Sequence, residues 1–252
     1  MSTWVDSHCH LHMSDVAPAR LVERAAAAGV EWMVCPGTDA DSSEAALAIA
    51  DAFPGTVLAA SGLHPHDASR WPEDGDRIAD LAARSVAIGE CGLDFYRNLS
   101  PREDQLTAFR AQVALAIDLD LPIIAHVRDA FGEMFDELEA SGAGPRTIMH
   151  CWTGGTRWTK RFETLGVTFS FAGPVTYPTG DTVRLAAAVA PQDRTMVETD
   201  TPYLTPPPDR HLPNEPANVV EVGRALAEVW GVGVDVVARS TTAVATRVFG
   251  RV

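Results

Sequence analysis

The chain has 252 residues, of which 46% are hydrophobic and 21% charged, and this composition is typical of a globular protein with a substantial core. Its formal net charge of −14 counts against a protein that binds duplex DNA through a broad basic surface. It does not exclude a nuclease, because bound divalent cations can supply positive charge locally. No apolar run approaches the ~20 residues of a membrane-spanning helix, and the opening residues lack the features of a signal peptide, so we expect a cytoplasmic protein without a membrane partner.

Strand-like runs alternate with helix-like runs from one end of the chain to the other. The strand-like runs are rich in Val, Ile, Thr and Met without strict alternation, as expected for parallel strands that are covered on both faces. They occupy residues 3–6, 32–35, 57–61, 86–89, 122–125, 147–149, 168–171 and 195–198. Amphipathic helical patterns lie between them, and two more helical patterns follow the eighth run.

Eight βα repeats predict the α/β class, as a TIM (β/α)8 barrel, with residues 1–252 forming one domain. An open, doubly wound sheet is the alternative. We favour the barrel, because it brings residues from distant parts of the chain together at one site. It arranges the carboxyl ends of all strands in a ring, whereas an open sheet spreads them along a line. The proline-rich stretch 201–216 is then expected to form a rigid loop over the mouth of the barrel.

Ionisable side chains stand at the ends of five of the eight runs. They are His8, His10, Glu90, His126, His150 and Asp200. An ionisable group at the end of a buried strand is costly unless something compensates it, and a ring of strand ends offers one shared partner. Imidazole and carboxylate ligands suit a pair of zinc or manganese ions better than magnesium, and paired ions are typical of hydrolysis. The sequence therefore predicts a binuclear metal site.

Neighbours of these residues have two interpretations. Asp6 either orients an imidazole from behind or caps the turn, and both stay open. His12 is expected to be a solvated loop residue. Cys9, Cys91 and Cys151 adjoin proposed ligands, and we expect each thiol to point to the opposite face of its strand. Trp152, Tyr203 and Phe95 could stack on a terminal base, but packing in the core or at the barrel rim is favoured.

Eight motifs in order along the chain carry a family resemblance. They read DSHCHL, GLHPH, GECGLDFY, PIIAHVRDA, HCWTGG, FSFAGPVT, VETDTPYL and NEPANV. Together they resemble the TatD-type metal-dependent hydrolases of the amidohydrolase superfamily. The resemblance implies the same barrel fold and a divalent-metal-dependent deoxyribonuclease, commonly a 3′–5′ exonuclease acting on single-stranded DNA. We expect single-stranded DNA or a small phosphoester as substrate, and we favour a monomer.

The resemblance also implies roles for individual residues. It assigns one of two divalent ions (zinc, manganese or magnesium) to His8, His10, Glu90 and Asp200, and the other to Glu90, His126 and His150. Catalysis would use Glu90 and Asp200, with Asp200 as general base toward a bridging water. His64 would lie on the substrate side, and our own mechanism has the leaving oxygen stabilised by a metal or by a group such as His64. The substrate side would be lined by Asp94, Tyr96, Arg128 and Arg210. We add Glu198 to these substrate-side residues because it is expected to point inward. Its alternative is a deeper position in which it holds a ligand or a basic group. The alternative for Arg128 is a surface pair with Asp129.

The chain departs from the family pattern at His12 and in the loop at residues 210–214, where one basic residue is missing. These changes spare the metal site but bear on the substrate. An amidohydrolase-type enzyme that cleaves a small ester, amide or lactone is therefore an alternative function, and a non-catalytic metal-binding protein is a third.

Overall fold

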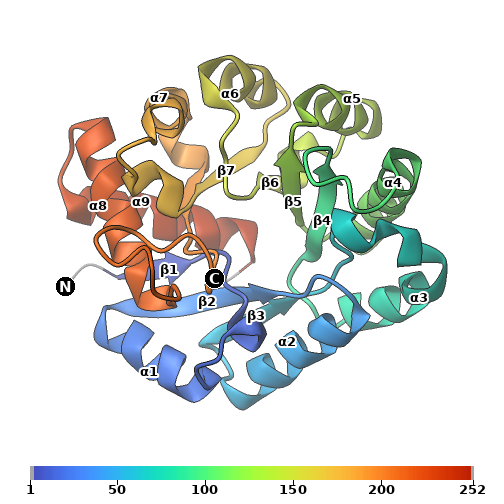
Figure 1. Ribbon diagram of the computed structural model, residues 1–252, viewed down its shortest axis with the longest axis horizontal. Coiled ribbons are helices and arrows are strands. Elements are labelled where there is room, and N and C mark those ends of the chain that lie inside the picture. Colours follow the sequence, from blue (N-terminus) through green and yellow to red (C-terminus); the bar gives the residue numbers. More distant parts are fainter. Residues whose placement is uncertain (1–2, 251–252) are drawn as a thin grey trace.

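The computed structural model describes residues 3–250, which form a ring of parallel strands surrounded by helices (Figure 1). The strands are β1 (Trp4–Asp6), β2 (Val30–Pro36), β3 (Val57–Ala60), β4 (Ile88–Asp94), β5 (Ile123–Arg128), β6 (Thr147–Met149), β7 (Thr168–Phe171) and β8 (Thr195–Val197). The helices are α1 (Pro18–Ala27), α2 (Ala40–Ala52), α3 (Trp71–Ala82), α4 (Arg102–Asp118), α5 (Phe131–Ser141), α6 (Gly155–Glu163), α7 (Asp181–Val189), α8 (Val219–Trp230) and α9 (Val234–Val248).

The strands close into a barrel. They pair in parallel in the orders β1-β2-β3 and β4-β5-β6-β7-β8. Parallel bridges between Ser61 and Ile88 and between Cys9 and Thr201 join these two groups at both seams. At the second seam, the Asp200 amide donates to the His8 carbonyl at 2.9 Å. The predicted (β/α)8 barrel is confirmed, and the open sheet is excluded because both edges are joined.

Strands β4 and β5 extend beyond their predicted ends. The sequence placed these strands at residues 86–89 and 122–125, but they run to Asp94 and Arg128. The glycines of the GECGLD segment resemble a turn, yet Gly92 has a φ of 140° within the strand. A β-carbon at Gly92 would lie 2.0 Å from the carbonyl oxygen of His126, so only glycine lets β5 approach this closely. Glu90 and His126 therefore lie within strands, not after them.

The barrel interior is apolar at the end opposite the strand carboxyl termini. The inward cluster contains Val5, Trp32, Val34, Ile124, Ile148 and Met196, packed against Val244, Ala245 and Phe249 at the end of the chain. Their neighbours along the strands pack outward against the helices, as alternation requires. Helix α9 covers this end of the barrel, and the ionisable side chains of the predicted metal site lie at the other end. Among residues 3–250, no helix combines the length and the apolar character needed to cross a bilayer.

Candidate metal centre

Glu90 lies at the centre of the strand carboxyl ends and is 3% exposed. Its Oε2 is 3.4 Å from Nε2 of His8 and 3.3 Å from Nε2 of His10. Oδ1 of Asp200 approaches the same two nitrogens at 3.7 and 3.6 Å. Ligand atoms of His8, His10 and Asp200 all lie within 4.8 Å of one another. The structure therefore brings together the four side chains expected to hold one ion.

The other oxygen of Glu90 faces a second group of imidazoles. Its Oε1 is 3.1 Å from Nδ1 of His126 and 3.4 Å from Nε2 of His150. Nε2 of His64 lies 3.4 Å from the same oxygen. The two oxygens of one carboxylate thus face different sets of nitrogens, which is the arrangement required of a ligand that bridges two ions.

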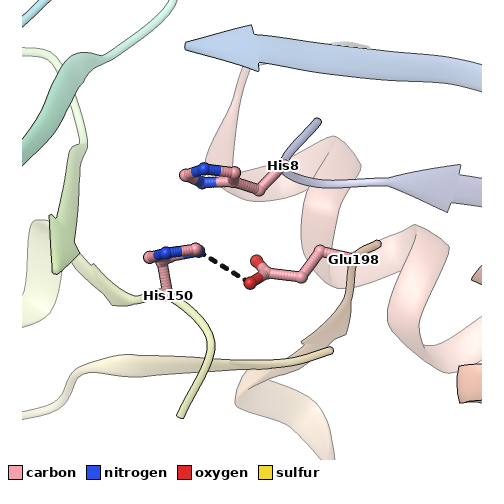
Figure 2. Close-up of side chains that lie close together, drawn as sticks. All are labelled: His8, His150 and Glu198. Carbon is pink, nitrogen blue, oxygen red and sulfur yellow. Dashed lines mark hydrogen bonds and ion pairs between the residues drawn. The ribbon is translucent and has the colours of Figure 1, made fainter. Parts of the chain in front are cut away.

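His150 is held from behind by Glu198. Figure 2 shows the His150 ring stacked on that of His8, with Glu198 beside it. The centroids of the two rings are 3.7 Å apart. Oε1 of Glu198 lies 2.7 Å from Nδ1 of His150 and also accepts from the Cys151 amide at 2.7 Å. Glu198 is fully buried. It lies in the deeper position given as its alternative, where it offers no contact to a substrate.

Asp94 has a similar place behind His126. Its Oδ2 is 2.9 Å from Nε2 of His66 and 3.3 Å from Nε2 of His126. Its Oδ1 accepts from the backbone amides of Tyr96 and Arg97 at 3.0 and 2.7 Å. Asp94 is buried, so it is placed to orient imidazoles. It does not line the substrate side, which is where we had expected it. His66 was missed by the sequence reasoning, although it is the second histidine of GLHPH.

These partners decide which nitrogen of each imidazole is free. In a neutral imidazole, the ring nitrogen that faces a carbonyl or carboxylate acceptor carries the proton. On the side away from the centre, Nδ1 of His10 faces the Pro36 carbonyl at 3.0 Å, Nδ1 of His150 faces Glu198, and Nε2 of His126 faces Asp94. The other nitrogen of each ring faces Glu90, and it could offer its lone pair to a cation bound between them.

His64 has the opposite arrangement. Its Nδ1 accepts from the His66 amide at 3.1 Å, so the proton lies on Nε2, the atom facing Glu90. Burial lowers the pKa of His64 to about 4, which keeps the ring neutral. His64 is therefore arranged as a hydrogen-bond donor at the centre, while three of its neighbours are arranged as ligands.

The charges of the site leave a place for a cation. Burial, together with the charge of His150, lowers the pKa of His8 to about 3, so this imidazole is neutral. Burial alone would lower the pKa of His150, but the charges of Glu198 and Glu90 raise it well above its usual range. Burial alone would raise the pKa of Glu90, but the charge of His150 holds it well below its usual range. A bound cation would take the place of the proton on His150, because neutral imidazoles and ionised carboxylates are the forms that bind cations. The donor set therefore fits divalent ions of the zinc and manganese type.

Asp6 supports the backbone and does not touch an imidazole. Its Oδ1 accepts from the Thr199 amide at 2.9 Å and from the His8 amide at 3.3 Å, while Oδ2 accepts from the Thr199 hydroxyl at 2.6 Å. Among the described residues, Nδ1 of His8 has no hydrogen-bond partner. Of the two interpretations left open, the structure favours the cap, which ties β1 to the turn after β8.

A pocket of about 690 Å³ opens above the candidate metal centre. Its lining includes His10, His64, His66, Glu90, Arg97, His126, Arg128, His150, Cys151, Asp200 and Tyr203. Cys9 and Cys91 are buried away from it as expected, but Cys151 faces the pocket, because a φ of 44° turns its backbone out of the strand direction. His12 is half-buried with Nδ1 3.4 Å from Sγ of Cys35, so the expected solvated position is wrong.

The remaining expected substrate residues surround the mouth. The Arg128 guanidinium lies 3.9 Å from the centre of the Tyr96 ring, and among the described residues it forms no ion pair with Asp129. Arg210 lies over the Tyr177 ring instead of in the pocket lining. Of the three stacking candidates, Trp152 and Phe95 are buried, and Tyr203 is 54% exposed beside the pocket.

Fold and site together define a (β/α)8 barrel with a candidate metal centre at the carboxyl ends of its strands. The family model described as TatD related DNase matches residues 5–250. The chain belongs to this family.

Several known proteins are similar over nearly the whole chain. An uncharacterized metal-dependent hydrolase of Bacillus subtilis, YabD, is 37% identical, and the match covers 97% of this chain and 98% of that protein. A Pectobacterium parmentieri protein named 3′-5′ ssDNA/RNA exonuclease TatD is also 37% identical, covering 91% and 92%. The crystal structure of the TatD homolog YJJV from Escherichia coli superposes with a TM-score of 0.88 at 27% identity, covering 98% and 97%.

Proposed function

We propose that the protein is a divalent-metal-dependent phosphodiesterase that removes nucleotides from the 3′ end of single-stranded DNA. The observation that carries this proposal is the central carboxylate of Glu90, whose two oxygens face two separate sets of imidazoles. The name of the similar Pectobacterium protein supports the choice of substrate and direction.

Two ions would share Glu90. His8, His10 and Asp200 would complete one ligand set, while His126 and His150 would complete the other. When bound, a pair of divalent cations supplies Lewis acidity to a phosphodiester and makes a nearby water more acidic. Zinc, manganese and magnesium are all candidates, and the donor set favours the first two.

Asp200 would act as the general base. Of the two carboxylates among the proposed ligands, Glu90 is buried and Asp200 is only half-buried. Asp200 faces the pocket where a phosphodiester would lie. It would accept the proton of the attacking water. His64, with its proton on Nε2, would donate a hydrogen bond to the leaving oxygen from the other side of Glu90.

The experiment is digestion of 5′-labelled single-stranded DNA by the purified protein with Mn²⁺ or Mg²⁺. We expect a ladder that shortens one nucleotide at a time, and loss of the ladder with EDTA or in Glu90→Gln. Glu139→Gln, on the exposed surface of α5, is the matched control and should remain active. Activity that survives in Glu90→Gln would refute the assigned centre. Turnover of a small ester, amide or lactone without any action on DNA would favour the alternative function.

A further inference from the structure

Helix α4 carries two glutamines on the face that it packs against the barrel. Gln105 and Gln112 are seven residues, or about two helical turns, apart, so they lie on the same side of the helix. This side lies against β4 (Figure 1), and both glutamines are fully buried. The third glutamine of the chain, Gln192, is exposed. A polar side chain in a buried helix face is costly unless hydrogen bonds satisfy it.

The carboxamide of Gln112 binds both backbone groups of Leu63. Its Oε1 accepts from the Leu63 amide at 2.7 Å, and its Nε2 donates to the Leu63 carbonyl at 3.1 Å. Nε2 also donates to the Ala108 carbonyl, one turn back in α4, at 3.2 Å. Leu63 directly precedes His64 in the chain. Gln112 therefore fixes the backbone from which the proposed hydrogen-bond donor extends.

Gln105 makes the same pair of contacts at the end of β4. Its Oε1 accepts from the Asp94 amide at 2.8 Å, and its Nε2 donates to the carbonyls of Asp94 and Ser100 at 3.2 and 2.9 Å. The Ser100 hydroxyl in turn donates to the His66 carbonyl at 2.8 Å. Gln105 therefore fixes the backbone of Asp94, whose carboxylate lies between the rings of His66 and His126.

Each carboxamide takes the place of a neighbouring strand. β3 ends at Ala60 and is joined to β4 by the bridge between Ser61 and Ile88, but β4 continues to Asp94. Continued in register, the partner of Asp94 would fall within a 3-10 helix, η2 (Pro65–Arg70), which is not a strand. Buried peptide groups left without partners are costly. A glutamine side chain offers a donor and an acceptor as a peptide group does, so it can satisfy them.

We propose that Gln105 and Gln112 are positioning residues for two different functions of the centre. Gln112 sets the place of the donor His64, and Gln105 sets the place of Asp94, which orients His126. This inference rests on the proposed function, and neither glutamine would touch the substrate or an ion. A displaced His64 would slow the reaction, whereas a displaced Asp94 would weaken one of the two cation sites, because it supports a ligand.

The first test measures kcat and KM of the full-length, manganese-loaded enzyme on 5′-labelled single-stranded DNA. Gln112→Met keeps the length of the side chain but removes its hydrogen bonds. It should lower kcat about 10- to 100-fold, since a misplacement of about 1 Å is enough for such a loss, and leave KM and the manganese content unchanged. In a His64→Ala background the same substitution should lower kcat no further, because the residue that it positions is gone.

The second test is calorimetric titration of Mn²⁺ into the metal-free protein. Gln105→Met should weaken the binding of one of the two ions about 10- to 100-fold, the range typical of a lost supporting contact, and leave the binding of the other ion unchanged. In a His126→Ala background it should change the titration no further. Gln→Glu keeps the acceptor but removes both amide protons, so it serves as the second variant at either position if the methionine variant does not fold.

A matched control separates positioning from loss of stability. Thr241→Val removes a buried hydroxyl whose hydrogen bond to the Val237 carbonyl, at 2.9 Å, lies in α9 at the closed end of the barrel. It should leave kcat and the titration unchanged even where it lowers the melting temperature. An additive loss in either double variant would overturn the positioning role of that glutamine.

Failure of the proposed function has a different signature. A wild-type enzyme without activity on oligonucleotides and on bis(p-nitrophenyl) phosphate would overturn the proposed function, and the role of Gln112 with it. The Mn²⁺ titrations do not depend on activity, so they would still decide the role of Gln105.

Discussion

The group behind each imidazole decides which of its ring nitrogens faces the pocket. A carbonyl behind His10 and carboxylates behind His126 and His150 leave their lone pairs directed at the centre. The backbone amide behind His64 does the reverse and leaves a proton there. Of the five histidines around Glu90, these four thus differ in whether they would bind a cation or donate a proton, and the difference comes from groups behind their rings.

This division predicts different results for two alanine variants. His10→Ala should lower the metal content of the purified protein, because it removes a ligand. His64→Ala should keep the metal content and lower kcat about 10²- to 10⁴-fold, the range typical of a lost proton donor. Inductively coupled plasma mass spectrometry and single-turnover rates measure the two effects. Equal metal loss in both variants would show that His64 is a ligand.

A variant of Glu198 tests whether the carboxylate behind His150 contributes to metal binding. Glu198→Gln keeps the size of the side chain but removes the charge that faces Nδ1 of His150. Changes to such supporting groups typically weaken metal binding 10- to 100-fold. Calorimetric titration of Mn²⁺ into the metal-free variant should show this loss, with Glu139→Gln as the control that does not. Unchanged affinity would mean that the ring of His150 is fixed by its stacking on His8 alone.

The sequence predicted the proposed metal ligands better than the carboxylates that lie behind them. Pairs such as His8 and His10 are visible because polar groups interrupt apolar runs at predictable strand ends. The position of Asp94 or Glu198 behind a ligand depends on which way a side chain turns at a strand end, and a pattern of residue types does not specify this. The stacking of Arg210 on Tyr177 likewise depends on the path of an irregular loop.

Among the elements, β4 and β5 depend on glycine at their contact. Gly92→Ala should lower the free energy of unfolding by more than Gly231→Ala. Both glycines have positive φ, but a β-carbon at Gly92 meets the His126 carbonyl, whereas at Gly231 it meets nothing within 4 Å. The conformational penalty at Gly231, whose φ is 66°, is expected to be about 1–2 kcal/mol. The φ of 140° at Gly92 is open essentially to glycine alone, so its conformational penalty is larger and adds to the steric one. Urea denaturation measures the difference, and equal losses would contradict a close contact between the two strands.

Helix α2 begins with a cap whose strength depends on pH. Oδ1 of Asp39 accepts from the Ser42 amide at 2.7 Å, and the Ser42 hydroxyl accepts from the Asp39 amide at 2.9 Å. Asp39→Ala should cost about 0.5–2 kcal/mol at neutral pH. Partial burial alone would raise the pKa of Asp39, but its bonds with Ser42 and the charge of Arg70 lower it below its ordinary value of 3.8.

The sign of this shift fixes the pH range of the effect. A carboxyl with a lowered pKa stabilises the folded state above its ordinary pKa, and this contribution is lost as the pH falls through the folded-state value. The stability difference between wild type and Asp39→Ala should therefore shrink below about pH 4. Asp39→Asn keeps the cap acceptor without the charge. The stability difference between Asp39→Asn and Asp39→Ala should therefore change little with pH. A constant difference between wild type and Asp39→Ala from pH 7 to pH 2 would contradict the assignment.

For the whole molecule, the repeat of strand and helix was enough to predict the barrel. Eight strand-like runs with covered faces have few other ways to bury both sides, and the carboxyl ends then have to meet. Closure rests on short bridges at two seams, which no local pattern in the sequence predicts. That residues 1–252 act as one domain, in a cytoplasmic monomer, stays a prediction.

Anomalous diffraction from crystals grown with Mn²⁺ or Zn²⁺ would locate the ions directly. We expect two anomalous peaks, one on each side of Glu90, with the first bound by His8, His10 and Asp200 and the second by His126 and His150. Peaks at other positions, or none at saturating metal, would contradict a centre built on a shared glutamate.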